Sequence, residues 1–141
     1  MQDANGDILF CDLELALPDL SAARLGQLQD ALIKLGAPKG TQFIDDDGQT
    51  LASFGDISVV GIGLDGTGLP ESAYENFDPD TFNDQVVDAL GDAYSFGGSH
   101  MGARYTFFYY HGPDSRHIEG ILRQITAAMP IATGAQFEHL T

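Results

Sequence analysis

The sequence contains few cationic residues and almost no cysteine. Its 141 residues include six Lys and Arg against 21 Asp and Glu, which gives a formal net charge of −15. Such a charge repels nucleic acid and anionic membranes, so we expect neither as a partner, and it attracts basic proteins and metal cations. The single cysteine, Cys11, excludes an intramolecular disulfide and a cysteine-rich zinc site, and its place in an apolar strand pattern predicts a buried, inert thiol.

Long apolar runs are also missing. No run is long enough for a transmembrane helix, and residues 1–7 lack the basic and apolar regions of a signal peptide, so we predict a cytoplasmic location. A hydrophobic content of 43%, with nine Phe and five Tyr, is typical of a folded globular chain. The length predicts a single domain covering residues 1–141.

The acidic residues are concentrated in the middle of the chain. Residues 40–103 contain twelve of the 21 Asp and Glu and no Lys or Arg. If this stretch forms one face, that face attracts a basic partner. The alternative is that the acidity keeps the protein soluble in a salty medium and has no partner.

Two parts of the chain repeat the same order of signals. Pro18–Ser21 opens a predicted helix, and Gly40–Phe43, with the sequence Gly-Thr-Gln-Phe, follows that helix. Pro113–Ser115 opens another helix, which Gly134–Phe137, with the sequence Gly-Ala-Gln-Phe, follows. A strand-like run precedes both units, so the chain is predicted to contain a repeated strand–helix–strand unit.

The periodicity of apolar residues predicts the elements. Alternation over residues 9–17 predicts a strand with one buried face, and further strands are expected at residues 41–44, 50–54, 57–64, 105–110 and 137–140. Helices are expected from Pro18–Ser21 to about Gly36, over 79–93, and from Pro113–Ser115 to about Met129, with residues 65–80 as a loop. The side chains expected to face inward from these helices are Leu25, Leu28, Leu32, Leu35, Phe82, Val86, Ala89, Leu90, Ile118, Ile121, Leu122, Ile125 and Met129.

Helices between strands require crossovers, and right-handed crossovers place them on one face of the sheet. The fold class is therefore predicted to be α+β. We expect a two-layer sandwich, ferredoxin-like with an additional αβ unit, in which a mixed or antiparallel sheet carries its helices on one face.

Three stretches superficially match ligand-binding loops. The acidic residues from Asp3 to Glu14 match a calcium loop except that Ile8 stands where glycine is needed. Residues 45–47 are three aspartates, which we interpret as a solvated hairpin turn because neighbouring strand residues point to opposite faces. Gly61–Gly68 lacks the Lys-Ser/Thr of a phosphate loop and is interpreted as a strand-to-loop turn. We therefore predict no metal site and no cofactor.

Residues 105–110 are Thr, Phe or Tyr throughout, so both faces of that strand are aromatic. One face is expected in the core, and the other lies under a helix or forms an exposed platform. Four polar residues at this end of the chain form an alternative pocket, in which a small ligand-binding or enzymatic module would use Tyr109, His111, His117 and Glu119. No serine near them has the surroundings of a nucleophile, so no catalytic residue is assigned.

Part of the chain resembles a known group of proteins. The stretch Leu64–Tyr74, the later Gly-Gly-Ser-His-Met-Gly segment, the aromatic strand and Gly112–Asp114 together resemble small acidic bacterial proteins, many uncharacterised, that include immunity proteins of polymorphic toxin systems. The resemblance covers roughly residues 57–130. It implies a non-enzymatic inhibitor of a partner toxin, and it carries over no functional residues.

The leading hypothesis is an acidic, non-enzymatic binding protein that neutralises a basic partner, for which a toxin with nuclease activity is the example we consider. Carboxylates would steer association, and a buried aromatic such as Tyr74, Phe77 or Tyr94 would anchor it. The predicted partner-binding residues are Glu71, Tyr74, Glu75, Phe77, Asp78, Asp80, Asp84 and Asp88. The alternatives are the histidine-bearing pocket and a structural domain with a generic salt-tolerant surface. The oligomeric state is open, with a homodimer as one option.

Overall fold

The computed structural model describes residues 12–140, which form two compact units, residues 12–57 and Ser58–Leu140. Cys11, the calcium-loop residues before Asp12 and the start of the predicted strand over 9–17 lie outside the described residues. The expectation of a single domain stays a prediction, because each unit is compact by itself.

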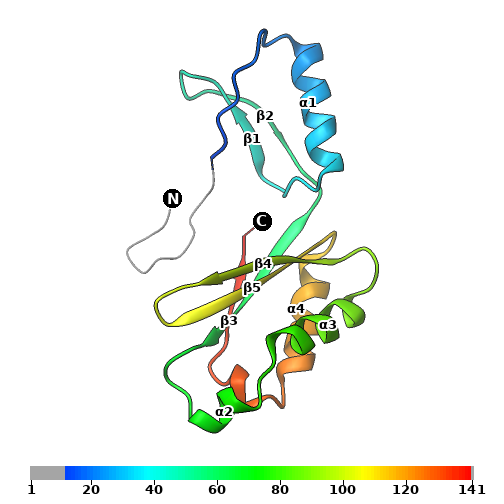
Figure 1. The fold of residues 1–141 in the computed structure, drawn as a ribbon. Coiled ribbons are helices and arrows are strands. Elements are labelled where there is room, and N and C mark those ends of the chain that lie inside the picture. The colour runs from blue at the N-terminus through cyan, green and yellow to red at the C-terminus, as the bar shows by residue number, and fades with distance from the viewer. Residues whose placement is uncertain (1–11, 141) are drawn as a thin grey trace. The chain divides into compact units, whose positions relative to one another are not determined.

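The first unit contains one helix and one hairpin. Helix α1 (Ala22–Lys34) begins after Ser21, whose hydroxyl accepts a hydrogen bond from the Arg24 backbone N–H. Strands β1 (Thr41–Ile44) and β2 (Thr50–Phe54) follow and pair antiparallel, as the sequence predicts (Figure 1).

The three aspartates lie in the turn of this hairpin. The Asp45 carboxylate accepts hydrogen bonds from the backbone N–H groups of Asp47 at 3.0 Å and Gln49 at 2.8 Å. This side chain therefore closes the turn on its own backbone, as aspartate commonly does. The turn interpretation is confirmed.

The predicted strand over residues 9–17 is wrong in its described part. Residues 12–17 are in no strand, and the side chains of Leu13 and Leu15 are 79% and 50% exposed. The apolar alternation is correct for a strand, but a strand forms only against a neighbour that accepts its hydrogen bonds. No described strand pairs with these residues.

The second unit has the order β3 (Ser58–Asp65), α2 (Glu71–Glu75), α3 (Pro79–Leu90), β4 (Ser95–Met101), β5 (Tyr105–Gly112), α4 (Ser115–Thr126), a 3-10 turn η1 (Pro130–Ala132) and β6 (Gln136–His139). Its strands form one antiparallel sheet in the order β4-β5-β3-β6. Apart from the short α2 and η1, this is the βαββαβ connection of a ferredoxin-like sandwich, so the predicted fold class is confirmed.

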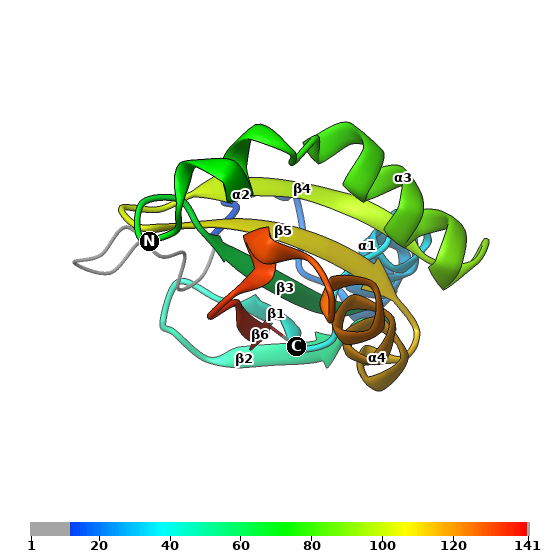
Figure 2. The same ribbon diagram turned by 90° about the horizontal axis from the view of Figure 1, so that it is seen from below.

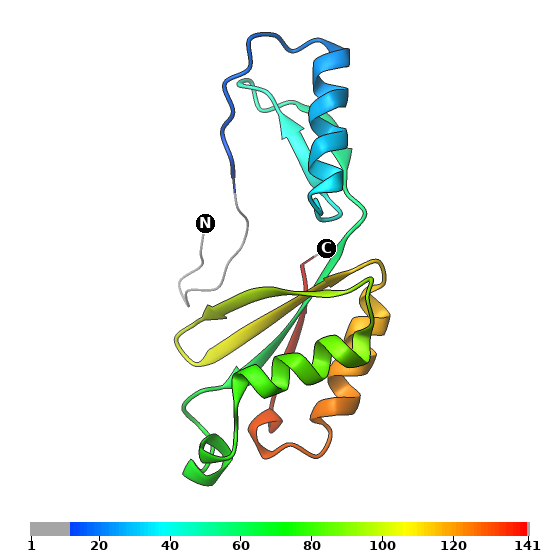
Figure 3. The ribbon, with the colours of Figure 1, turned by 45° about the vertical axis from the view of Figure 1, so that its right-hand side comes forward.

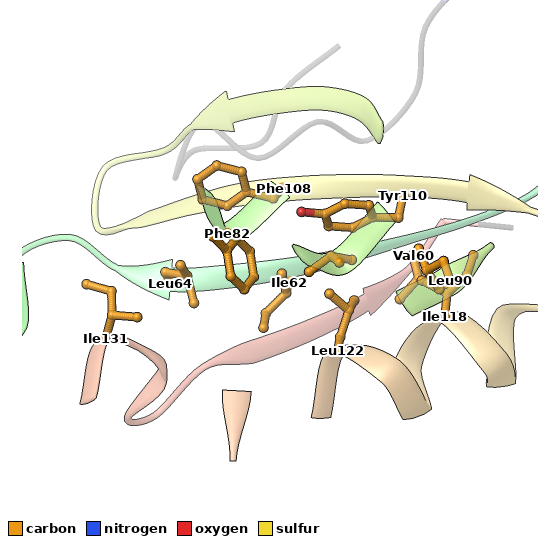
Figure 4. Close-up of a cluster of buried hydrophobic side chains, with 11 residues drawn as sticks. Val60, Ile62, Leu64, Phe82, Leu90, Phe108, Tyr110, Ile118, Leu122 and Ile131 are labelled. Atoms are coloured by element: carbon orange, nitrogen blue, oxygen red, sulfur yellow. The ribbon is translucent and has the colours of Figure 1, made fainter. Parts of the chain in front are cut away.

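The main core lies between this sheet and helices α3 and α4. Alternate residues of β3 and β5 point to the helices, which cover the same face of the sheet (Figures 2 and 3). Figure 4 shows their side chains meeting those of the helices. The buried cluster consists of Val60, Ile62, Leu64, Phe82, Val86, Leu90, Phe108, Tyr110, Ile118, Leu122 and Ile131.

The opposite face of the sheet carries a second, smaller buried cluster. Phe107 and Tyr109 lie on it with Val59, and they are only 2% and 9% exposed. A Cβ atom at Gly63 would lie 2.6 Å from the Phe107 ring, and one at Gly61 would lie 2.6 Å from the Tyr109 ring. The rings thus lie close over these glycines, and these two aromatic residues do not form an exposed platform.

Other expectations need correction. Leu35 is 84% exposed and Ala89 is also exposed, because α1 ends at Lys34 and because Ala89 lies on the outer side of α3. The predicted loop over 65–80 contains α2, and β4 has no counterpart among the predicted strands. Within residues 12–140, no helix has the length and apolarity needed to cross a membrane. The cytoplasmic location stays a prediction.

Candidate functional site

Six carboxylates project from α2, α3 and the segment between them. All six side chains belong to exposed residues, and we call them the acidic surface. Its members are Glu71, Glu75, Asp78, Asp80, Asp84 and Asp88. The sequence predicted each of them as a partner-binding residue.

The sequence of α3 determines where its acidic residues point. Phe82, Val86 and Leu90 are buried against the sheet, so the residues between them must face outward. Asp84 lies four residues from both Asp80 and Asp88, which places the three carboxylates in one row along the helix. The helix therefore presents an unbroken line of negative charge.

Asp78 belongs to this surface and also fixes the start of α3. Its carboxylate accepts hydrogen bonds from the Thr81 hydroxyl at 2.6 Å and from the Asp80 backbone N–H at 3.2 Å. These bonds, that from Thr81 first, lower the pKa of the Asp78 carboxyl below its ordinary value. Pro79 occupies the first turn, where its missing N–H costs nothing. Asp78 is thus held ionised and in place.

No described cation neutralises the acidic surface. The ion pairs among residues 12–140 join Arg104 to Asp65, and Arg123 and His139 to Glu119. None of these carboxylates belongs to the acidic surface. Its charge is therefore directed at solvent or at a partner.

The predicted aromatic anchors are part-buried and bonded within the fold. The Tyr74 hydroxyl donates to the Asp65 carbonyl oxygen at 3.0 Å and accepts from the Leu69 N–H at 3.1 Å. The Phe77 ring packs against Phe82, with ring centres 5.6 Å apart. These residues hold the loop before α3 against the core, and only the carboxylate-bearing residues of the predicted set are exposed.

Tyr94, the third aromatic residue named as an anchor, also makes contacts within the fold. Its ring lies 4.9 Å from that of His117, and it packs against the main core. An anchoring role for any of the three aromatics stays a prediction.

Sequence reasoning did not find the pair of Asp65 and Arg104 at the end of β3. The Asp65 side chain is 6% exposed, and its carboxylate accepts two hydrogen bonds from the Arg104 guanidinium, the shorter at 2.8 Å. It also accepts the backbone N–H groups of Thr67 and Gly68. The Arg104 bond first, and then these two, hold the pKa of the Asp65 carboxyl well below its usual range. The pair therefore connects the loop after β3 to Arg104, which lies between β4 and β5.

The structure does not bring the four residues of the alternative pocket together. Tyr109 and His111 lie on the sheet face away from the main core, where the Tyr109 hydroxyl is 3.5 Å from the Glu138 carboxylate and the His111 ring lies against Gly97. Burial lowers the pKa of His111, so its imidazole is neutral at neutral pH.

The other two members of that pocket lie on α4. His117 Nε2 is 3.1 Å from the Leu90 carbonyl oxygen, and Glu119 pairs with Arg123 and His139. These hydrogen bonds, that from Arg123 first, lower the pKa of Glu119. Each side chain is thus engaged with a different neighbour.

A surface hollow of about 290 Å³ lies elsewhere, at the end of α4 beside η1 and β6. The Arg123 guanidinium lies 4.1 Å from the centre of the Phe137 ring, and both side chains line the hollow. The lining residues are Arg123, Thr126, Ala127, Ala132, Gly134, Ala135 and Phe137, and none of the predicted pocket residues is among them.

Metal-ligating side chains do not cluster in the described part of the chain. Over residues 12–140, no group of three or more His, Cys, Asp or Glu side chains is placed to hold a metal ion. Comparison of the chain with protein-family models, with curated proteins and with solved structures found no match.

Proposed function

We propose that this protein is a non-enzymatic binding protein whose acidic surface engages a basic partner protein. One observation carries the proposal. Six exposed carboxylates share α2, α3 and the segment between them, and none forms an ion pair with a described residue. Such a surface raises the association rate of a cationic partner and disfavours an anionic one.

The row on α3 sets what the partner must offer. Asp80, Asp84 and Asp88 repel one another at four-residue spacing, and Lys or Arg side chains that approach the row relieve this repulsion. The partner is therefore expected to place several cations along one line. Charge pairs mainly supply rate and register, so apolar contacts beside the row must contribute much of the affinity.

We further propose that the partner is a toxin that this protein neutralises in the cytoplasm. The support is the resemblance to immunity proteins together with the sign and concentration of the charge. A nuclease is a suitable candidate, since enzymes that bind nucleic acid present basic surfaces.

The test is capture of a partner with a matched pair of charge variants. One carries Asp80→Asn, Asp84→Asn and Asp88→Asn on α3, and the other carries Asp46→Asn, Asp47→Asn and Asp56→Asn, which remove the same charge from exposed residues of the first unit. Each protein is immobilised, exposed to a lysate of its own organism at low and at moderate salt, and the retained proteins are identified by mass spectrometry.

The proposal requires one basic protein that the unaltered chain and the Asp46 set retain at moderate salt and that the α3 set loses. The same loss with both sets, or retention of mixed basic proteins at low salt only, would show that the charge acts generically, as in a salt-tolerant structural domain. Retention of no basic protein would also overturn the proposal. Inhibition of the purified partner's toxicity then tests the toxin assignment.

A further inference from the structure

The repeat predicted from the sequence can be followed in the structure, and within residues 12–140 only its second copy has both of its strands. In the second unit, β5, α4 and β6 follow one another, with Pro113-Asp114 between β5 and α4. In the first unit, residues 12–17, α1 and β1 follow one another, with Pro18-Asp19 before α1. Matching Pro18 to Pro113 and Phe43 to Phe137 aligns the two copies.

Strand pairing places β2 in the position of β3. In the second unit β6 pairs antiparallel with β3, with Phe137 opposite Ile62. In the first unit β1 pairs antiparallel with β2, with Phe43 opposite Ala52. The equivalent strands therefore pair in the same antiparallel direction, although the β1–β2 pairing has a register shift after Phe43 that the β3–β6 pairing lacks.

The other side of β3 shows what belongs beside β2. Strand β5 pairs along the full length of β3, and Phe108 lies opposite Ile62. The equivalent of β5 is the segment 12–17, in which Leu13 corresponds to Phe108 and Leu15 to Tyr110. No described strand occupies this side of β2. The unpaired side of β1 is different, because its equivalent β6 is itself the edge of its sheet.

The two leucines of residues 12–17 are far more exposed than the equivalent residues of β5. Phe108 and Tyr110 are 7% and 0% exposed, whereas Leu13 and Leu15 are 79% and 50% exposed. Among residues 12–57, a segment with the apolar alternation of a strand and a sheet edge with no described neighbour are thus present together, and they are not paired with each other. Backbone hydrogen bonds between the segment and this edge would give each of them the neighbouring strand that it lacks.

We propose that the edge of β2 that no described strand covers takes residues 12–17 of a second copy of this chain, and that the exchange is reciprocal and forms a dimer. The chain's own segment does not occupy the edge, and the identical segment of a second copy completes it. Each copy donates one segment and accepts one at its own β2 edge, so the exchange forms a closed, symmetric dimer. The correspondence predicts the register, with Leu13 of one copy opposite Ala52 of the other.

Charge does not oppose this contact. Strand β2 has the sequence Thr-Leu-Ala-Ser-Phe and carries no charged side chain. In an extended segment, Asp12 and Glu14 point to the face opposite Leu13 and Leu15, so both carboxylates stay in solvent. The exchange joins an uncharged strand to residues 12–17, and neither contains a residue of the acidic surface, so the inference stands apart from the proposed function.

The experiment is a disulfide test between two differently sized chains. Both carry Cys11→Ser; one has Leu13→Cys, and the other has Ala52→Cys and a mass tag. The chains are mixed, oxidised mildly and separated without reductant. We expect a mixed disulfide between the two, and a solution mass of twice 15.1 kDa for the unaltered chain by light scattering. The control pair replaces Ala52→Cys by Ser53→Cys, which faces the other side of the strand, and is expected to cross-link several-fold less.

Three results would overturn the proposal. They are a monomeric mass for the unaltered chain, a mixed disulfide that forms equally in the control pair, and a disulfide that forms only within one chain when Leu13→Cys and Ala52→Cys are combined. The last result would mean that the segment pairs with its own β2. Because Leu13 is exposed, Leu13→Asp gives an independent test that spares folding, and it is expected to yield a monomer.

Discussion

Asp65 is the described carboxylate with the most hydrogen-bond donors around it. Its bonds to Arg104, Thr67 N–H and Gly68 N–H favour the ionised form in the folded chain only, so its pKa is lower folded than unfolded. A lowered pKa adds stability that is fully present above the unfolded value of about 3.9 and is lost as the pH falls below it.

We therefore expect Asp65→Asn to lower the urea midpoint of unfolding at neutral pH, and the gap from the unaltered chain to narrow as the pH falls from about 5 to about 3. Urea titrations followed by circular dichroism at several pH values measure this gap. Asp88→Asn, which removes an exposed carboxylate, is the control and should show a much smaller gap at neutral pH. A gap for Asp65→Asn that stays constant down to pH 3 would contradict the assignment.

Replacing either of two glycines in the second unit by alanine is expected to change stability in opposite directions. At Gly63 a Cβ atom would lie 2.6 Å from the Phe107 ring, which is 2% exposed and has little room to move. At Gly120, on the exposed side of α4, a Cβ atom meets nothing within 4 Å. We expect Gly63→Ala to destabilise the fold by about 1–3 kcal/mol and Gly120→Ala to stabilise it by about 0.5–1 kcal/mol.

Chemical denaturation of the two variants measures both values. Equal effects of the same sign would mean that the ring of Phe107 does not lie over Gly63. The pair is informative because the added methyl group is the same in both, so only the surroundings of the glycine differ.

At the scale of the element, α3 combines a buried stripe that stabilises it with a charged row that does not. Like charges four residues apart destabilise a helix by a few tenths of a kcal/mol per pair, and Asp84 takes part in two such pairs. We expect Asp84→Asn to raise the free energy of unfolding by about 0.5 kcal/mol at low salt and by less at high salt.

The same substitution is expected to weaken capture of the basic partner. A residue that costs stability and favours binding is the pattern of a functional surface. Thermal melts at two salt concentrations test the first effect, and the salt dependence separates charge repulsion from a change in helix propensity. A loss of stability with Asp84→Asn would mean that the carboxylate has a favourable contact in the folded chain.

Element by element, the sequence predicted what local signals determine. The hairpin of β1 and β2 was confirmed at its residue bounds. Helices α3 and α4 were confirmed with their inward-facing stripes, Ala89 excepted, because apolar period and capping residues act within a few positions. Strand β4, with the sequence Ser-Phe-Gly-Gly-Ser-His-Met, was missed because it forms through its pairing with β5 and lacks any strand pattern of its own. Residues 12–17 show the converse, a strand pattern without a described partner strand.

The candidate site divides in the same way. The spacing of Asp80, Asp84 and Asp88 predicted one exposed row, because a single helix sets their directions. The pair of Asp65 and Arg104 joins residues 39 positions apart, and nothing local connects them. The turn signal Asp-Gly-Thr-Gly after β3 could have identified half of it, since aspartate accepts backbone N–H groups in such turns.

At the scale of the whole molecule, the buried apolar residues are divided unequally. Of the sixteen buried hydrophobic residues in the described chain, only Phe54 belongs to residues 12–57. Six of the nine exposed large hydrophobic residues belong to the same 46-residue stretch. Local stability follows burial, so the first unit is expected to open more easily than the second.

Native-state hydrogen exchange measures this difference. We expect amides of α1, β1 and β2 to exchange more than about tenfold faster than those of β3, whose residues are all buried.

Phe82→Ala removes a core side chain that is 1% exposed and is expected to cost about 3–5 kcal/mol, which should raise exchange throughout Ser58–Leu140. Phe54→Ala is the matched substitution in the first unit, where its ring packs 4.8 Å from that of Phe43, and it should raise exchange in residues 12–57 alone. If either variant raised exchange equally in both units, they would unfold as one cooperative domain, as the length of the chain predicts. If exchange in the first unit slowed with protein concentration, a second copy would be supplying the contacts that its own core lacks.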